Sequence, residues 1–251
     1  MINILLSGVS GAMGTTLQQI IAANPNTQVV AGFDHQEITT LPFPVYSDLK
    51  NCNEIVDVII DFSHFAAFPS IFGFARSKKI PIVIATTGLS DENLMTIKEG
   101  AKEFPVFKTA NLSLGINLIA KMLKEMVGKL ESGFDIEIIE KHHNKKLDAP
   151  SGTALLLADA INDGLETKKD YIYGRYGRDA KRSENELGIH AIRGGTIAGE
   201  HSVIFAGNDE IIEVNHMALS KKVFAEGAVR AAQYLVGKEA GLYDMSMVVN
   251  D

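Results

Sequence analysis

The sequence contains a single cysteine, Cys52, among its 251 residues. One cysteine cannot form an intramolecular disulfide, and it cannot supply the several thiolates of a cysteine-built zinc site. No apolar run approaches the roughly 18 residues that a membrane-spanning helix needs. The first residues show neither a basic segment nor a small-residue cleavage site, so they do not predict a signal peptide. We therefore expect a soluble, cytoplasmic protein with no membrane partner.

An excess of basic residues is also missing. Lys and Arg total 24 whereas Asp and Glu total 31, so the formal net charge is −7. No segment is basic enough to follow a phosphate backbone, which argues against nucleic acid as a partner. Hydrophobic residues make up 46% of the chain and charged residues 22%, values that exclude a disordered or collagen-like chain.

The first half of the chain alternates between strand-like and helix-like segments. Short apolar runs predict buried strands at Ile2–Leu6, Thr27–Phe33, Ile55–Phe62, Ile80–Ala85 and Pro105–Ala110. Apolar residues at helical spacing predict helices between them, at Met13–Ala23, Phe65–Ala75 and Asp91–Lys102. This alternation predicts right-handed crossovers and an α/β fold with a Rossmann-like, doubly wound parallel sheet.

The pattern changes in the second half. Helices are predicted at Leu114–Leu130, Ser151–Ile161 and Val223–Val236, and strands at Phe134–Glu140, His190–Arg193, Ile197–Phe205 and Glu210–His216. The short turns between the last strands indicate an antiparallel or mixed sheet, and hence a second, α+β domain. Residues 163–186 are polar and aperiodic, which predicts a long functional or mobile loop.

A glycine-rich turn, Gly8-Val9-Ser10-Gly11-Ala12-Met13-Gly14, joins the first predicted strand to the first predicted helix. Glycines permit a tight turn and a close backbone approach, and the helix N-terminus offers N–H groups to a pyrophosphate. The spacing is G-x-x-G-x-x-G instead of the usual G-x-G-x-x-G, so its place between strand and helix carries the interpretation. A turn that binds no ligand is the alternative.

The residue that supports dinucleotide binding is Asp34, which lies 20 residues after Gly14 at the end of the second strand. A carboxylate there can accept hydrogen bonds from an adenosine ribose. It favours NAD(H), because it would repel a 2′-phosphate and no arginine follows it. Two further strand ends, Ala85-Thr86-Thr87-Gly88 and Thr109-Ala110-Asn111-Leu112, are expected at the same edge of the sheet. Ordinary capped turns are the alternative for both.

The segment Glu140–Ala154 gathers three lysines and two histidines in an acidic protein. Ser151 marks a helix start, where its hydroxyl and the N–H groups of Gly152 and Thr153 form a site for an anion. Lys146 adds a positive charge, so the segment suits a carboxylate substrate. Taken singly, each of these residues is more typical of a helix cap or a solvated loop, and it is their combination within one segment that indicates a site.

The adjacent histidines in this segment, His142 and His143, cannot point the same way on an extended chain. We expect one to face the reacting centre and the other to bind or support. Histidine and lysine are the side chains most readily tuned to donate a proton near neutral pH. The spacing of the two histidines is poor for chelation, and the other histidines show no ligand pattern, so no metal is expected.

These motifs resemble those of the 4-hydroxy-tetrahydrodipicolinate reductase family, also called dihydrodipicolinate reductases, of diaminopimelate and lysine biosynthesis. The resemblance covers nearly the whole chain. Its most specific part is E-K-H-H-N-K-K-L-D-A-P-S-G-T-A at Glu140–Ala154. The other matching segments are the glycine turn, D-F-S at Asp61–Ser63, A-T-T-G at Ala85–Gly88, A-N-L-S at Ala110–Ser113, G-I-H-A-I-R-G-G-T-I-A-G-E-H at Gly188–His201 and F-A-E-G-A-V-R-A-A at Phe224–Ala232.

The resemblance implies hydride transfer from NADH or NADPH to a small cyclic dicarboxylate, with loss of water. His142 would be the proton donor or acceptor and Lys146 a second proton donor. The substrate's carboxylates would be held by His143, Ser151, Gly152 and Thr153. The cofactor would be bound by Gly8, Val9, Ser10, Gly11, Ala12, Met13, Asp34, Ala85, Thr86, Thr87, Thr109, Ala110, Asn111 and Leu112.

The resemblance also implies a domain layout and a homotetramer. The last helix would pack back onto the nucleotide domain, so residues 1–112 plus 221–251 would bind the dinucleotide. Residues 113–220 would bind substrate and mediate oligomerisation. Two positions depart from the family pattern. His35 stands where the family often has a basic residue, which leaves NADH or NADPH open, and Leu112 replaces the more usual phenylalanine.

Three other classes remain open from the residues alone. A phosphorylating aldehyde dehydrogenase needs a nucleophilic cysteine at the domain junction, whereas Cys52 precedes the third predicted strand. A homoserine-type dehydrogenase needs no cysteine. A sensor that binds NAD(H) and an effector would show cofactor binding without substrate-dependent oxidation, so an assay for turnover distinguishes it.

Overall fold

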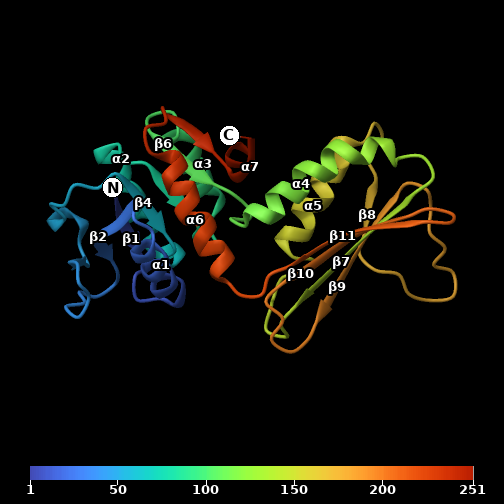
Figure 1. The fold of residues 1–251 in the computed structure, drawn as a ribbon, viewed down its shortest axis with the longest axis horizontal. Helices are drawn as coiled ribbons and strands as arrows, with labels where there is room; N and C mark the ends of the chain where they lie inside the picture. The colour runs from blue at the N-terminus through green and yellow to red at the C-terminus, as the bar shows by residue number, and fades with distance from the viewer. Residues whose placement is uncertain (251) are drawn as a thin grey trace. The chain divides into compact units, whose positions relative to one another are not determined.

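The computed structural model describes residues 1–250 and divides into two compact units. The first comprises Met1–Ser113 together with the chain from Lys222 onward, and the second comprises Leu114–Lys221. Each boundary lies one residue after the corresponding boundary expected from the sequence. Figure 1 shows the chain leaving the first unit before α4 and returning to it at α6. Among the described residues, no helix combines the length and hydropathy needed to cross a membrane.

The first unit is built on a seven-stranded sheet in which every neighbouring pair is parallel. In spatial order the strands are β12 (Gly241–Tyr243), β6 (Pro105–Lys108), β5 (Ile82–Ile84), β4 (Val58–Asp61), β1 (Ile2–Ser7), β2 (Thr27–Phe33) and β3 (Val45–Tyr46). The chain moves outward from β1 first in one direction and then in the other. This is the doubly wound, Rossmann-like order, and the predicted fold class is confirmed.

Helices cover both faces of this sheet. On one face α1 (Ala12–Ala23) packs against α6 (Lys222–Leu235), and α6 also contacts β4, β5 and β6. The other face carries α2 (Phe68–Lys78) and α3 (Asp91–Gly100). The unit's remaining elements are the short helix α7 (Met245–Asn250) and two 3-10 turns, η1 (Leu49–Asn51) and η2 (Phe65–Ala67).

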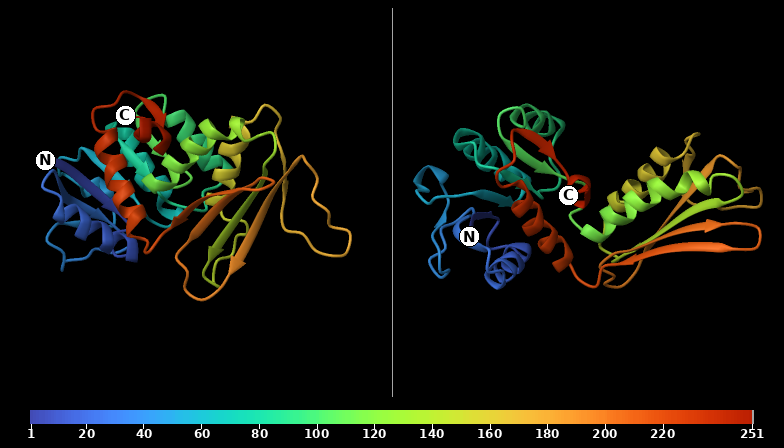
Figure 2. Two further views of the ribbon diagram at one scale, coloured as in Figure 1. Left: turned by 45° about the vertical axis from the view of Figure 1, so that its right-hand side comes forward. Right: turned by 45° about the horizontal axis from the view of Figure 1, so that its top comes forward.

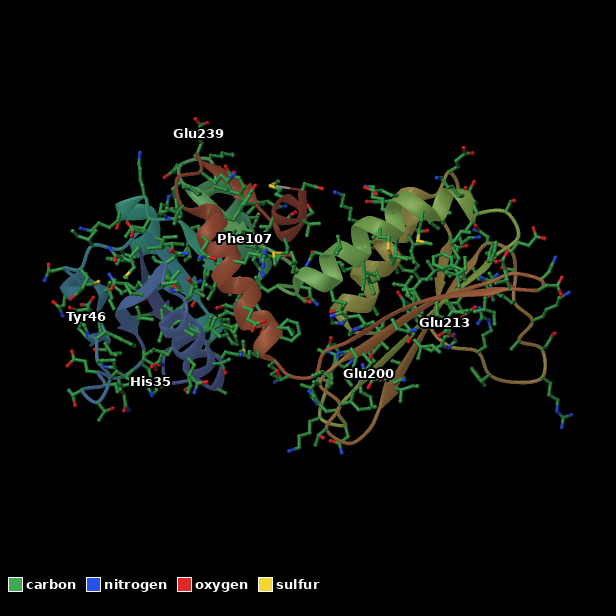
Figure 3. The ribbon with its side chains drawn as sticks, in the orientation of Figure 1. His35, Tyr46, Phe107, Glu200, Glu213 and Glu239 are labelled. Carbon is green, nitrogen blue, oxygen red and sulfur yellow. The ribbon has the colours of Figure 1, made fainter. Side chains whose placement is uncertain are left out.

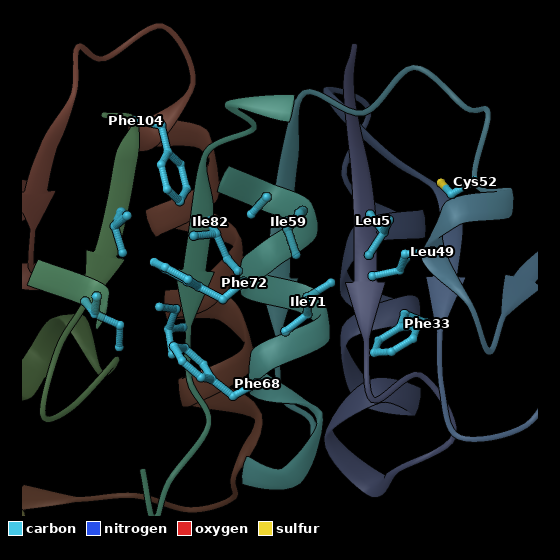
Figure 4. Close-up of a cluster of buried hydrophobic side chains, with 14 of the residues drawn as sticks. Leu5, Phe33, Leu49, Cys52, Ile59, Phe68, Ile71, Phe72, Ile82 and Phe104 are labelled. Atoms are coloured by element: carbon cyan, nitrogen blue, oxygen red, sulfur yellow. The ribbon is translucent and has the colours of Figure 1, made fainter. Parts of the chain in front are cut away.

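The core beneath α2 follows from strand alternation and register. Every second side chain of a strand faces the same side, and Leu5, Ile59 and Ile82 occupy matching positions on β1, β4 and β5. Figure 4 shows these side chains against aromatic rings of α2, including Phe68 and Phe72. These matching side chains therefore form one buried apolar layer between the strands and α2.

The second unit contains a five-stranded mixed sheet. In spatial order its strands are β11 (Ile211–Met217), β10 (Glu200–Ala206), β7 (Asp135–His142), β9 (Glu186–Arg193) and β8 (Asp170–Ile172). The strand β10 runs antiparallel to β11 and β7, whereas β9 runs parallel to β7 and β8. Two helices, α4 (Leu114–Met126) and α5 (Gly152–Gly164), lie side by side on one face, as Figure 2 shows. A 3-10 turn, η3 (Val127–Lys129), follows α4.

The central strand β7 turns three alternate residues toward the helices. Ile136 and Ile138 join an apolar core with Leu157 and Ile161 of α5. The third residue in this series is Glu140, which is also fully buried. A buried carboxylate in line with two isoleucines is not expected from hydrophobic patterning alone.

The structure departs from the prediction over residues 163–186. A loop is expected there, but α5 continues to Gly164 and residues 170–172 form β8, an edge strand beside β9. Tyr171 anchors this strand by donating a hydrogen bond to Asp159 (2.7 Å). Strands of two or three residues have no measurable alternation, which is also why β3 and β12 are missing from the prediction.

Candidate active site

Four neighbouring strands of the first sheet end level with one another. The register pairs Ser7 with Asp61, Asp61 with Ile84, and Ile84 with Lys108. The residues that follow these strands therefore leave the sheet at one edge. Three of the segments expected to contact a cofactor, residues 8–13, 85–87 and 109–112, start there. Asp34 follows Phe33, which is paired with Ser7, so it starts there as well.

The glycine turn after β1 has no room for side chains at two positions. Gly8 has φ +78°, and a Cβ on it would lie 2.7 Å from the carbonyl oxygen of Phe62. A Cβ on Gly14 would overlap the carbonyl oxygens of Gly8 and Val9. Gly11 is the N-cap of α1 and supplies no side-chain hydrogen bond to the first helical turn. The N–H groups at this helix start, together with the positive end of its dipole, fit a pyrophosphate.

Asp34 is largely buried, and its carboxylate accepts a hydrogen bond from the glycine turn. Its Oδ2 accepts a hydrogen bond from the Ser10 N–H (2.8 Å), and its Oδ1 accepts one from the His35 N–H (2.8 Å). Burial alone would raise the pKa of Asp34, but hydrogen bonds from Ser10 and His35 outweigh it and lower the pKa. His35, labelled in Figure 3, also pairs through its exposed ring with Asp34. The carboxylate is thus ionised and fixed in place.

A second buried carboxylate, Asp61, joins the ends of β4 and β5. Thr86 donates its hydroxyl proton to Oδ2 of Asp61 (2.7 Å), and the Ser63 hydroxyl donates to Oδ1 (2.6 Å). The Thr86 hydroxyl therefore donates its proton to another group of the protein, the Asp61 carboxylate. Lys108 lies at the end of β6, where burial lowers its pKa although the nearby charge of Asp61 acts in the opposite direction.

The segment after β6 is held by its own turn and by α6. The Thr109 hydroxyl donates to the carbonyl of Asn111 (3.2 Å), and the Asn111 side chain accepts from the Ser113 N–H (2.7 Å). Leu112 is buried, and its carbonyl lies so close to Gly227 that a Cβ on that glycine would overlap it. The close approach of α6 thus depends on glycine at position 227.

The second cluster belongs to the second unit and begins at the end of β7. The predicted strand ends at Glu140, whereas β7 continues to His142, because Lys141 and His142 pair with Ile192 and Arg193 of β9. His142 therefore lies two residues beyond Glu140 on the same face of the strand. Its Nδ1 is 2.7 Å from Oε2 of Glu140, and its side chain is 12% exposed.

The helix start after this strand is organised around Ser151, the N-cap of α5. The Ser151 hydroxyl oxygen accepts a hydrogen bond from the Ala154 N–H (3.1 Å) and lies 3.0 Å from Nε2 of His201 on β10. Since Oγ already accepts one hydrogen bond, its own proton is available to Nε2 of His201. Burial lowers the pKa of His201 to about 4, so this histidine is neutral at physiological pH.

The first turn of α5 contains the other residues expected to bind an anion, Gly152 and Thr153. A Cβ on Gly152 would meet nothing within 4 Å, so space is open beside this glycine. No acidic residue lies in this turn to compete with an anion for the helix dipole. The structure thus brings Ser151, Gly152 and Thr153 together at one helix start.

The connection from β7 to α5 contains His143 and Lys146. The His143 N–H donates to the carbonyl of Ile197 (2.8 Å), and the Lys146 ammonium pairs with the carboxylate of Asp148 at 2.7 and 2.9 Å. The Lys146 side chain is 20% exposed and that of Asp148 is 60% exposed. Within residues 1–250, no group of three or more His, Cys, Asp or Glu side chains could hold a metal ion.

Three residues around this cluster are not singled out by the sequence. Arg193 and His201 reach it from β9 and β10, and Gly199 lies against the His142 ring. Strand register, which the sequence does not reveal, places them there. Glu140 could have been identified from the sequence, because strand alternation continued to His142 places the two residues on the same face.

The fold defines a two-domain α/β protein that has a dinucleotide-type parallel sheet in one unit and a mixed sheet with two helices in the other. Comparison with known proteins makes this specific. The sequence profile "Dihydrodipicolinate reductase, N-terminus" matches residues 2–112, and "Dihydrodipicolinate reductase, C-terminus" matches residues 115–249. The chain belongs to the dihydrodipicolinate reductase family.

Individual relatives agree with this assignment. The 4-hydroxy-tetrahydrodipicolinate reductase of Caldanaerobacter subterraneus subsp. tengcongensis is 53% identical over 99% of this chain and 98% of its own length. The reductase of the same name from Clostridium tetani is 47% identical over 100% of this chain and 98% of its own. A dipicolinate-bound dihydrodipicolinate reductase from Paenisporosarcina sp. TG-14 has a TM-score of 0.79 at 23% identity, covering 97% of each chain, which supports the fold.

Proposed function

We propose that the protein reduces 4-hydroxy-tetrahydrodipicolinate to tetrahydrodipicolinate with NADH or NADPH, with loss of water, in diaminopimelate and lysine biosynthesis. One observation carries the proposal. Family membership spans both units, and His142, Lys146 and the Ser151 helix start lie within ten residues of one another along the second unit. Relatives of full length that carry the reductase name support the same activity.

In this proposal the first unit binds the cofactor. The backbone of Gly8–Met13 receives the pyrophosphate, the Asp34 carboxylate receives the adenosine ribose, and Ala85–Thr87 and Thr109–Leu112 line the nicotinamide end. When bound, the reduced nicotinamide supplies a hydride to a ring carbon of the substrate. The overlap that any side chain would cause at Gly8 or Gly14 fits a turn reserved for close backbone approach.

In this proposal the second unit binds the substrate and supplies the groups that transfer a proton. Ser151, Gly152, Thr153 and His143 hold the carboxylates, while Lys146 offsets their negative charge. Overall the substrate loses one water and gains one hydride and one proton, so a proton donor is needed beside the anion site. His142 is the proton donor or acceptor there, and Lys146 is the second donor.

The proposal also includes a homotetramer formed through the second sheet, and a cytoplasmic location. In Figure 2 no helix of the second unit covers the sheet face opposite α4 and α5. That face carries partly exposed apolar side chains, including Ile139 and Ile204, and the more exposed Ile192. Light scattering of the purified protein tests the assembly state, and cell fractionation tests the location.

The activity is tested by loss of nicotinamide absorbance when the cyclic substrate, freshly condensed from pyruvate and aspartate semialdehyde, is added. NADH and NADPH are compared in parallel. Rapid oxidation that depends on the substrate supports the reductase. Cofactor binding by a folded protein, without oxidation of either cofactor, contradicts it and indicates a sensor or a different substrate.

A further inference from the structure

A single buried carboxylate, that of Glu140, connects the two functional parts of the second unit. Its Oε2 accepts hydrogen bonds from Nδ1 of His142 (2.7 Å) and from one terminal nitrogen of Arg193 (2.7 Å). Its Oε1 accepts from the Ser151 N–H (2.9 Å) and from the other terminal nitrogen of Arg193 (2.7 Å). Each oxygen thus receives two donors, and none of the carboxylate is left for solvent or substrate.

The charge of Glu140 is balanced where it lies. Burial alone would raise its pKa, but hydrogen bonds from Arg193, His142 and the Ser151 backbone outweigh burial and lower the pKa. The same contact raises the pKa of Arg193. Glu140 is therefore ionised at neutral pH, and an ionised carboxylate only accepts hydrogen bonds.

The ionised carboxylate of Glu140 determines which ring nitrogen of His142 carries a proton. Because its partner only accepts, Nδ1 must carry a proton, and Nε2 is the nitrogen left for proton exchange. Nε2 lies on the Gly199 side of the ring, 3.1 Å from where a Cβ on Gly199 would be. The other ring nearby is that of His201, with ring centroids 5.2 Å apart, and it is neutral. The charged residues of the adjoining loop are Lys145, Lys146 and Asp148, and Lys146 pairs with Asp148.

The same carboxylate also positions the anion-binding turn. It holds the N–H of Ser151, the residue that caps α5, while Arg193 donates a further hydrogen bond to the carbonyl of Asp148 (2.7 Å). A substitution at Glu140 therefore affects both His142 and the start of α5. His201 holds the hydroxyl of Ser151 from the other side.

We propose that Glu140 is a positioning residue of the reductase: it keeps the proton of His142 on Nδ1, frees Nε2 for proton transfer, and aligns that nitrogen with the anion-binding turn at Ser151. This inference rests on the proposed function. Glu140 has no contact with substrate in this role and acts entirely through His142 and Ser151.

The test is Glu140→Gln, which preserves size and removes the charge. The Ser151 N–H can only donate, so the amide oxygen must stay at the Oε1 position and the NH₂ group must occupy the Oε2 position. There the NH₂ group donates to Nδ1 of His142, which moves the histidine proton to Nε2. We expect kcat to fall by about 10²-fold or more, the contribution of a positioned acid or base.

A matched control lies three residues earlier on β7. Glu137 also accepts from a histidine, His190 (2.7 Å), and from both terminal nitrogens of Arg175 (3.1 and 2.9 Å). It lies on the opposite face of the strand, away from Glu140. Glu137→Gln therefore removes an equivalent carboxylate from the same strand without touching His142.

The direct readout is the tautomer of His142 in protein labelled with ¹⁵N-histidine, with its signals assigned by their absence in His142→Asn. We expect the Nδ1–H form in the wild type and in Glu137→Gln, and the Nε2–H form in Glu140→Gln. An Nε2–H form in the wild type overturns the inference without any variant. The inference is also overturned if folded Glu140→Gln keeps the Nδ1–H form, or if its kcat equals that of Glu137→Gln.

Failure of this inference and failure of the proposed function give different results. A wild type that oxidises neither cofactor with substrate contradicts the proposed function, while the tautomer measurement still tests the role of Glu140. An active wild type with equal kcat for Glu140→Gln and Glu137→Gln contradicts only the role of Glu140. Glu140→Asp, which restores the charge but is shorter, should recover the Nδ1–H form with part of the activity.

Discussion

Gly199 lies directly against the ring of His142, and a Cβ on this glycine would be 3.1 Å from Nε2. The backbone there has φ +155°, a conformation that side chains rarely adopt. Position 199 therefore keeps open the side of the ring from which a proton can be exchanged.

We predict that Gly199→Ala lowers kcat by less than the roughly 10²-fold that a displacement of about 1 Å causes, because the His142 ring must give by only a few tenths of an ångström. Backbone strain should also reduce stability by about 1–3 kcal/mol. Gly174→Ala is the control, since Gly174 has φ +82° and nothing within 4 Å of its Cβ position. If both variants lose the same activity when compared at equal folded fraction, contact with His142 is not the cause.

Removal of the His142 or Lys146 side chain should lower turnover strongly and leave the fold intact. His142→Ala leaves Glu140 with Arg193 and Ser151 as partners, and Lys146→Ala removes only the pair with the exposed Asp148. We expect each variant to lose about 10²–10⁴-fold in kcat, the range for general acid–base catalysis. Steady-state kinetics measure the loss, and circular dichroism with thermal unfolding checks the fold. Turnover at the wild-type rate in either variant contradicts the assigned role.

If Lys146 binds the substrate as proposed, its ion pair with Asp148 should compete with the substrate for the ammonium group. Exposed pairs contribute about 0.2–1 kcal/mol, so Asp148→Asn should lower KM for the dicarboxylate by roughly 1.4- to 5-fold and change kcat little. The matched control is Asp163→Asn, which removes a more distant pair with Lys124 (3.4 Å) on the same unit. A raised KM in Asp148→Asn would show that the carboxylate positions Lys146 instead of competing for it.

Periodicity predicts most of the first sheet, because its strands are buried runs such as Val58–Asp61 and its helices show regular apolar spacing. It predicts four of the five strands of the second sheet, all except β8, but not which strands are neighbours. Consecutive strands β9 and β10 are both paired with β7 and not with each other. That order depends on long-range pairing, which local pattern does not encode.

The candidate site shows the same division. The sequence indicates His142, Lys146 and Ser151, because they lie within one short segment. It does not indicate Arg193 or His201, which are far along the chain and reach the segment only through strand register. Residues that act through neighbours in sequence are predictable, whereas residues that act through neighbours in space require the structure.

The coenzyme preference should depend on the charge of Asp34. A fixed carboxylate beside the ribose site repels a 2′-phosphate, so we expect the wild type to favour NADH over NADPH in kcat/KM. Asp34→Asn keeps an oxygen acceptor for the Ser10 N–H and removes the charge, and it should shift the ratio toward NADPH by about tenfold, or about 1.4 kcal/mol.

The control for this shift is Asp57→Asn. Asp57 also accepts a backbone N–H, from Asn3 (2.7 Å), but Asn3 lies at the start of β1, away from the carboxyl edge. Parallel titrations with NADH and NADPH give both ratios. An unchanged ratio in Asp34→Asn would mean that the carboxylate does not face the 2′ position of the ribose.

Stability should fall in mild acid because of His201. Its pKa is about 4 in the folded protein, against an ordinary value of 6.5, so the unfolded chain binds a proton at higher pH than the folded one. The contribution of neutral His201 is therefore present above pH 6.5 and is lost as the pH falls from 6.5 toward 4. Between pH 7 and pH 5 we expect a loss of about 2 kcal/mol in the free energy of unfolding.

The measurement is urea unfolding of the wild type and His201→Gln at pH 7 and pH 5. Glutamine can still accept the Ser151 hydroxyl proton but does not titrate, so the variant should lose less stability than the wild type over this interval. The lowered pKa of Glu140 acts in the same direction only as the pH falls below about 4.5, which keeps the two effects apart. His216, whose pKa burial also lowers, is present in both proteins and cancels in the comparison. An equal loss in both proteins would show that His201 is not the group responsible.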